Sequence, residues 1–290
     1  MFSGVYTAIV TPFDRQGRVD YAKFRELIAM QAAKGVAGIV PVGTTGESPT
    51  LDVPEHEKVI ETAVEAAGSD IQVIAGTGGN ATSEALTLTR YAKEAGACAT
   101  LQVTPYYNKP SQEGLYRHFS AVADMGLPVV LYNVPGRASC EIAVDTVVRL
   151  ASHPNIVAIK EAGGSVDRVS AILSQCDIVV LSGDDSLTFP MMALGARGVV
   201  SVASNVAPQE VSEMARKALA GQWDEARRLH YKLYPLFADL FIDTNPVPVK
   251  AAMAMMGLID ESYRLPLCAM TEQNKQVLRQ TLQAQGLLPG

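Results

Sequence analysis

A lysine ends an apolar run in the stretch IVAIKEA, residues 156–162, where Lys160 follows four apolar side chains. An ammonium group is rarely buried, because it loses its hydration unless a partner compensates. Burial at a strand end would disfavour the charged form of Lys160 and make a neutral amine available. Such an amine can form a Schiff base with a keto acid, and the protonated imine then serves as an electron sink. The alternative, a strand-end lysine that reaches into solvent, is equally compatible with the spacing.

A second lysine, Lys250 in PVPVKAAMAMM, is the rival amine. It lies at the start of an expected helix, where we predict that its stem follows apolar surface while the ammonium group reaches water. Lys160 is therefore the stronger candidate nucleophile.

The segment GTTGES, residues 43–48, has the composition of an anion-binding loop. Gly43 and Gly46 allow a tight backbone turn whose N–H groups converge, and the Thr44 and Thr45 hydroxyls add further donors. A carboxylate would fit such a loop, as a keto acid requires. An ordinary turn between a strand and a helix would have similar glycines, so the motif alone is weak.

Two phenols and one guanidinium could complete a site for a keto acid. Tyr132 and Tyr107 could pass protons if they are linked to a hydroxyl such as Thr44, and Arg137 could bind a second carboxylate with two parallel hydrogen bonds. Packing tyrosines and a surface arginine after a Pro-Gly turn are the alternatives. The segment GTGGNA, residues 76–81, fits a loose dinucleotide pattern, but the next strand ends without the acidic residue that would hold a ribose.

The elements that must position these residues alternate between short Val/Ile-rich runs and amphipathic segments. Eight strand-then-helix units predict a (β/α)8 TIM barrel of class α/β, spanning residues 1–221, followed by an all-helical C-terminal extension, residues 222–290. In such barrels the active site lies at the carboxyl ends of the strands, which is where the candidate residues fall. The expected strands are Val5–Val10, Gly38–Val42, Ile71–Ala75, Ala97–Val103, Pro128–Tyr132, Ile156–Lys160, Ile178–Leu181 and Gly198–Ser201.

The expected helices include several that are followed by a glycine, a common signal for a helix end. They are Tyr21–Lys34, Pro54–Ala67, Thr82–Ala95 and Gln112–Asp124 in the barrel, and Pro208–Ala220, Gln222–Phe241, Val247–Met256 and Thr271–Ala284 at its end and in the extension.

Composition narrows the classes of function. The net charge is -6 with no Lys/Arg cluster, which argues against nucleic acid as a partner. The longest stretch without charge, Ala95–Asn108, is too short to span a bilayer, and the N-terminus lacks the basic region of a signal peptide. Four scattered cysteines without a C-x-x-C motif are typical of reduced thiols, so we expect a cytoplasmic protein. No His or carboxylate pair has metal-ligand spacing, so we expect no metal.

The motifs GTTGES, TPYYNKPSQEGLY, YNVPGR, IKEA and LSGDD, in this order, closely resemble those of the dihydrodipicolinate synthases, within the lysine-dependent aldolase superfamily that includes N-acetylneuraminate lyase. The resemblance covers essentially the whole chain. It implies a lyase of the carbon-oxygen class that needs no cofactor and condenses pyruvate with aspartate 4-semialdehyde. It also implies a homotetramer, a dimer of dimers, in which Tyr107 reaches into the neighbouring subunit.

The same resemblance implies a role for each matching residue. Lys160 would form the Schiff base, Thr44 and Thr45 would hold the pyruvate carboxylate, and Arg137 would hold the second substrate. Tyr132 would exchange protons with Thr44 and Tyr107, and backbone near Gly183 and Val202 would line the pocket.

In lysine-inhibited relatives the inhibitor binds at the dimer interface, and the resemblance implies a matching site in this chain. Val53 and Pro49 depart from the pattern of some inhibited relatives and bear on the strength of inhibition, while Ala138 replaces a common hydroxyl residue beside Arg137. The matching positions are Ser48, His56, Asn80, Glu84 and Tyr106.

Two other functions stay open at this point. One is a different pyruvate-dependent lyase, acting on a sugar acid or N-acetylneuraminate, which would keep Lys160 and the GTTGE loop but need groups that bind a polyol. The other is a barrel without activity that binds a small ligand, for which no imine would form with pyruvate.

Overall fold

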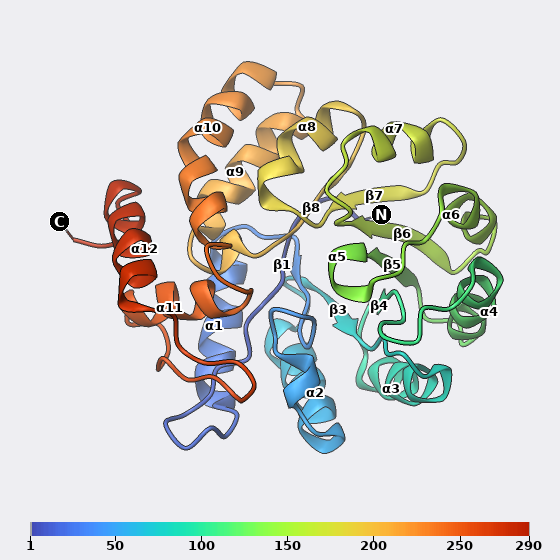
Figure 1. Ribbon diagram of the computed structural model, residues 1–290, viewed down its shortest axis with the longest axis horizontal. Coiled ribbons are helices and arrows are strands. Elements are labelled where there is room, and N and C mark those ends of the chain that lie inside the picture. Colours follow the sequence, from blue (N-terminus) through green and yellow to red (C-terminus); the bar gives the residue numbers. More distant parts are fainter. Residues whose placement is uncertain (1, 290) are drawn as a thin grey trace.

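The computed structural model describes residues 2–289, and its centre is a closed barrel of eight parallel strands paired in sequence order, with β1 against β8 (Figure 1). The predicted (β/α)8 barrel is therefore confirmed. The strands are β1 (Gly4–Thr7), β2 (Gly38–Ile39), β3 (Gln72–Gly76), β4 (Ala99–Val103), β5 (Val129–Asn133), β6 (Ile156–Glu161), β7 (Val179–Ser182) and β8 (Gly198–Ser201).

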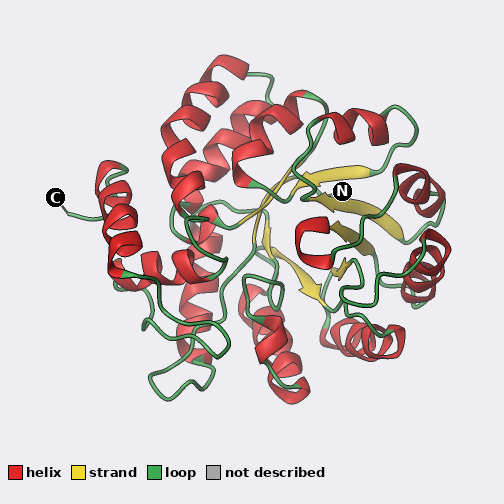
Figure 2. Cartoon of the chain, viewed as in Figure 1, coloured by secondary structure: helices red, strands yellow, loops and turns green. Residues whose placement is uncertain are grey.

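Helices surround the strands on all sides (Figure 2). They cover the outer face of the barrel. Because the strands are then buried on both faces, their sequences are almost continuously apolar. In the barrel they are α1 (Tyr21–Ala33), α2 (Val53–Ala67), α3 (Thr82–Ala95), α4 (Gln112–Ala123), α5 (Pro135–Ala138), α6 (Val144–Ala151), α7 (Asp167–Leu173) and α8 (Thr188–Ala193), with short 3-10 turns η1 (Ser48–Thr50), η2 (Asp185–Leu187) and η3 (Ala203–Asn205).

Local signals in the sequence set the ends of these helices. Asp52 and Glu55 form a reciprocal capping box at the start of α2, satisfying amides that have no partner within the helix. Gly96 ends α3 in the left-handed conformation, with φ 93°, and its amide bonds back to the last turn. These are features that a sequence displays directly, so the predicted helices agree with the observed ones to within one or two residues.

The core has two parts, one on each side of the sheet. Side chains such as Tyr6, Ile74, Leu101 and Val130 fill the barrel interior, while a larger layer packs between the strands and the helices. The barrel interior is therefore a packed core, and the loops after the strands form the rim where the candidate residues were expected.

The remaining helices are α9 (Pro208–Leu219), α10 (Trp223–Asp239), α11 (Val247–Met255) and α12 (Glu272–Ala284). In Figure 1, α11 and α12 lie at the left of the barrel, where they pack against each other. A domain boundary near Gly221 stays a prediction. No helix in residues 2–289 is both long enough and apolar enough to cross a membrane.

Candidate active site

Lys160 lies near the carboxyl end of β6, and its side chain is 6% exposed. In the sheet register it is paired with Tyr132 on β5, which places its Nζ 4.0 Å from the centre of the Tyr132 ring. Gly183, just after β7, leaves room for the lysine, because a Cβ there would lie 3.0 Å from Lys160 Cε. The structure thus brings together three of the predicted site residues on adjacent strands.

The two candidate lysines differ in their partners. Within the described residues, Lys160 has no carboxylate within 4 Å, whereas Lys250 Nζ lies 2.5 Å from Glu47 Oε1. Lys250 and Glu47 are both fully buried. The expectation that Lys250 reaches water is therefore wrong. Its helix packs against the mouth of the barrel, and a buried carboxylate replaces the water that the ammonium would otherwise need.

The GTTGES loop forms a compact turn at the end of β2. The amides of Gly46 and Ser48 both donate to the Gly43 carbonyl, and the Glu47 amide donates to the Thr44 carbonyl. Thr45 is buried and its Oγ1 accepts a bond of 3.0 Å from Asn245 Nδ2.

The loop opens onto a cavity of about 220 Å³ at the rim of the barrel. Thr44, Tyr132 and Arg137 line this cavity together with Ser48 and Tyr106. A cavity of this size suits a ligand of a few heavy atoms, such as a small keto acid.

Backbone strain is concentrated around this rim. Five non-glycine residues in the described chain have positive φ, and all follow strands β2, β4 or β5. Val42 is the most unusual, since a β-branched side chain is poorly tolerated in that region. Such strain commonly marks functional loops. The five residues are Val42, Glu47, Tyr107, Lys109 and Ser139.

Two predicted site residues are exposed to solvent on the loops that follow the strands. Arg137 is exposed on the short helix α5, where its Nη2 donates to the Asn245 carbonyl at 3.1 Å. The Tyr107 side chain is 90% exposed. Within one chain, therefore, Tyr107 does not reach Tyr132, and no hydrogen bond among the described residues joins Tyr132 to Thr44. Val202 lies just beyond β8, and its amide donates to Asp185 Oδ2 at 2.9 Å.

Buried acids support the strand ends on either side of Lys160. Glu161 accepts bonds from Asn133 Nδ2 and Arg168 Nε, each at 2.8 Å. On the other side, Asp185 is buried, and its carboxylate accepts bonds from the Val202 and Ala203 amides, each at 2.9 Å. Sequence reasoning missed these groups, although the Glu in IKEA and the Asp pair in LSGDD were visible, because nothing local reveals which buried acid has a partner.

The residues matched to a lysine site also gather at one place. Tyr106 and Ser48 line the cavity, and Asn80 Nδ2 donates to the Tyr106 carbonyl at 3.3 Å. Burial raises the pKa of the Tyr106 phenol, and the negative charge of Glu84 adds to that rise. His56 is buried on α2, and burial lowers its pKa to about 4. Glu84 is exposed.

The glycines of GTGGNA have a steric explanation. A Cβ on Gly76 would lie 2.5 Å from the Val42 carbonyl oxygen, and a Cβ on Gly78 would lie 2.3 Å from the Val103 nitrogen. These glycines let β3 and the loop after it approach the neighbouring strand ends, a role that requires no nucleotide.

A parallel eight-stranded barrel whose buried lysine, near the end of β6, has no carboxylate within 4 Å in residues 2–289 belongs to a class of barrels suited to amine–carbonyl chemistry. The family follows from comparison with known proteins. A model of the Dihydrodipicolinate synthetase family matches residues 1–285, and the chain belongs to this family.

Individual relatives agree with that assignment over their whole length. The chain is 52% identical to the 4-hydroxy-tetrahydrodipicolinate synthase of Syntrophobacter fumaroxidans, covering 99% of this chain and 100% of that one. The crystal structure of dihydrodipicolinate synthase from Aquifex aeolicus superposes with a TM-score of 0.97 at 52% identity and covers 100% of both chains. The Acinetobacter baumannii enzyme, solved in complex with pyruvate, has a TM-score of 0.98 at 45% identity, covering 99% of this chain and 100% of that one.

Proposed function

We propose that this chain catalyses the 4-hydroxy-tetrahydrodipicolinate synthase reaction, the condensation of pyruvate with L-aspartate 4-semialdehyde. This step commits carbon to diaminopimelate and lysine, and the enzyme is a carbon-oxygen lyase. The observation that carries the proposal is Lys160, which is buried beside Tyr132 and Gly183 and has no carboxylate oxygen within 4 Å among residues 2–289. Identity above 50% over whole chains of that name supports the choice within the family.

The chemistry follows from the amine. Lys160 Nζ attacks the carbonyl carbon of pyruvate and water leaves, giving a protonated imine. Loss of a methyl proton turns the imine into an enamine, whose carbon attacks the aldehyde of the second substrate. The amino group of that substrate then attacks the imine carbon and displaces Lys160, closing the ring and regenerating the free lysine.

The other residues bind and move protons. Thr44 and Thr45 would hold the pyruvate carboxylate, and Arg137 would hold the carboxylate of aspartate semialdehyde. Tyr132, whose ring lies against the Lys160 amine, would pass protons to and from the intermediates. Backbone near Gly183 and Val202 would line the pocket. The relative solved with pyruvate supports the first substrate.

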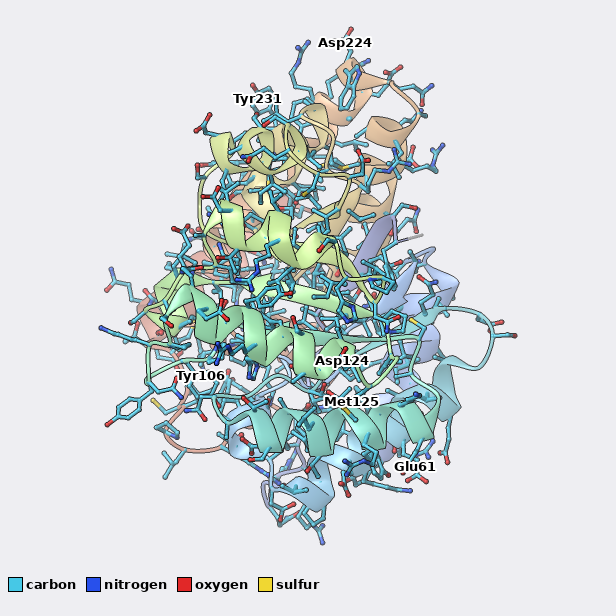
Figure 3. The ribbon with its side chains drawn as sticks, turned by 90° about the vertical axis from the view of Figure 1, so that its right-hand side faces the viewer. Glu61, Tyr106, Asp124, Met125, Asp224 and Tyr231 are labelled. Atoms are coloured by element: carbon cyan, nitrogen blue, oxygen red, sulfur yellow. The ribbon has the colours of Figure 1, made fainter. Side chains whose placement is uncertain are left out.

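A homotetramer built as a dimer of dimers is part of the proposal. Tyr107 would complete the proton relay from a neighbouring subunit, which its 90% exposure in the single chain supports. A second exposed aromatic surface on α10, containing Tyr231 and Tyr234, offers another contact, and Figure 3 shows Tyr106 and Tyr231 in well-separated parts of the molecule. A monomeric variant is known among relatives, at 41% identity and a TM-score of 0.96, covering 99% of this chain and 98% of that one.

Feedback by L-lysine is the proposed regulation. The structure of the Cyanidioschyzon merolae enzyme with lysine bound, 41% identical with a TM-score of 0.96 over 99% of both chains, supports it. In this chain Glu84 would accept an ammonium group, near the Tyr106 phenol.

The decisive experiment is reductive trapping. Borohydride added with pyruvate should attach a three-carbon adduct to Lys160, located by mass mapping, and Lys160→Ala should abolish it. Adduct on another side chain, or none, would reject the mechanism. Replacing aspartate semialdehyde by N-acetylneuraminate in a coupled assay separates the synthase from a sugar-acid lyase.

A further inference from the structure

The buried pair Glu47–Lys250 joins two parts of the chain that are 203 positions apart. Glu47 belongs to the loop after β2, and Lys250 to α11 in the C-terminal extension. The ammonium also lies 4.1 Å from the centre of the Phe13 ring. Because both charges are fully buried, neither can exchange its partner for water without the loop and the helix separating.

Stability alone is a poor explanation for this pair. The desolvation of two buried charges roughly offsets their attraction, so an apolar pair of similar volume would hold the fold about as well. What the ion pair adds is a fixed geometry. Glu47 is held in the left-handed region with φ 53°, and its amide and carbonyl bond to Thr44 and Thr50 on either side.

Neighbouring contacts from the extension act on the same loop. The Arg264 amide donates to Glu47 Oε2 at 3.3 Å, and its Nη1 donates to the Thr50 carbonyl at 2.8 Å. Asn245 Nδ2 donates to Thr45 Oγ1 at 3.0 Å. Residues 245–264 therefore hold the GTTGES loop at Thr45 and Glu47 and the turn after it at Thr50, and the buried ion pair is the most restrictive of these contacts.

We infer that Glu47 and Lys250 are positioning residues, which hold the turn carrying Thr44 and Thr45 in the geometry that receives the pyruvate carboxylate. The inference rests on the proposed function and deepens it, because it assigns part of the pyruvate site to the C-terminal extension. It also gives the second buried lysine a role that is not nucleophilic.

The test uses the double variant Glu47→Gln/Lys250→Met, which removes both charges without leaving one of them unpaired. Pyruvate KM should rise about tenfold, as expected when an aligned carboxylate site is loosened. The KM for aspartate semialdehyde should change less than about threefold, because Arg137 bonds to the Asn245 carbonyl and to neither member of the ion pair. Borohydride should still trap pyruvate on Lys160, at a higher pyruvate concentration. Denaturant unfolding should show the double variant to be folded under assay conditions.

Lys275→Met is the matched control. It breaks the Lys275–Glu261 pair, 2.8 Å long, which lies within the extension and does not touch the loop. It should leave both KM values within about twofold of the parent. If the double variant does not fold, the Arg264→Gln variant is tested in its place. Its partly exposed guanidinium holds the end of the same loop, and its removal should raise pyruvate KM about threefold.

The outcomes are distinguishable. A parent protein that traps no pyruvate overturns the proposed function and this inference with it. A parent that traps pyruvate, together with a folded double variant of unchanged pyruvate KM, overturns the inference alone. An equal rise in KM for both substrates would show a general structural role and would also overturn the inference. So would a loss of activity that matches the fraction of unfolded protein.

Discussion

Two buried lysines in one chain show how a partner decides what an amine can do. Burial lowers the pKa of Lys250 and the Glu47 carboxylate, 2.5 Å away, opposes that change, whereas Lys160 faces an aromatic ring and a glycine. Both end short apolar stretches, so local sequence could not separate them by burial. The difference arises from Glu47, which lies far from Lys250 in the chain and meets it only when the extension docks.

A residue-scale prediction concerns Glu84. If L-lysine binds beside Tyr106, millimolar lysine should inhibit the parent enzyme. Glu84→Gln should then raise the half-inhibitory concentration about tenfold, because one charge-assisted contact to the ammonium is lost. Steady-state rates against lysine concentration measure this.

Glu94→Gln, on the same helix and exposed, is the control and should keep the parent's inhibition. A parent rate that does not change with millimolar lysine would reject the regulatory site.

At the scale of elements, the sequence contained most of what builds the barrel. Strands surrounded by helices are apolar on both faces, and glycines mark the ends of several helices, so eight repeated units were recognisable. The residues at which individual strands end were harder to predict. The second strand stops at Ile39, whereas the apolar run predicts an end at Val42, because Pro41 has no amide to donate and Val42 has φ 49°.

Gly78 gives the element-scale prediction. A Cβ there would overlap the Val103 backbone at 2.3 Å, so Gly78→Ala should lower the free energy of unfolding by about 3 kcal/mol as β4 is forced to shift. Denaturant unfolding of the purified variant measures this.

Gly136→Ala is the matched control, because a Cβ added there would have no other atom within 4 Å, and its stability should stay within about 0.5 kcal/mol of the parent. Equal stabilities for the two variants would refute the steric explanation of the GTGGNA glycines.

At the scale of the whole molecule, the single chain lacks one part of its predicted site. Thr44, Tyr132 and Arg137 line one cavity at the rim and Lys160 lies against Tyr132, but Tyr107 projects outward. The positions of the first four residues could be predicted from sequence, because the carboxyl ends of all barrel strands lie at the same rim. The position of Tyr107 relative to another subunit depends on an interface whose partner surface no local pattern encodes.

Subunit sharing has a specific test. Tyr107→Phe and Lys160→Ala chains, each of low activity alone, should regain about a quarter of parent activity when coexpressed in equal amounts, since half the dimers are mixed and each has one intact site. Activity against mixing ratio is the measurement. No recovery at any ratio would count against a phenol supplied by the neighbour.

The link between α11 and the threonine loop has a consequence for biosynthesis. Translation delivers the eight strands first, and residues 245–264 leave the ribosome only after all of them. A nascent barrel would thus carry its reactive amine before its acid-binding turn is fastened. The chain would bind pyruvate efficiently only after the final helices have folded. An incomplete polypeptide would therefore react little with pyruvate in the cell.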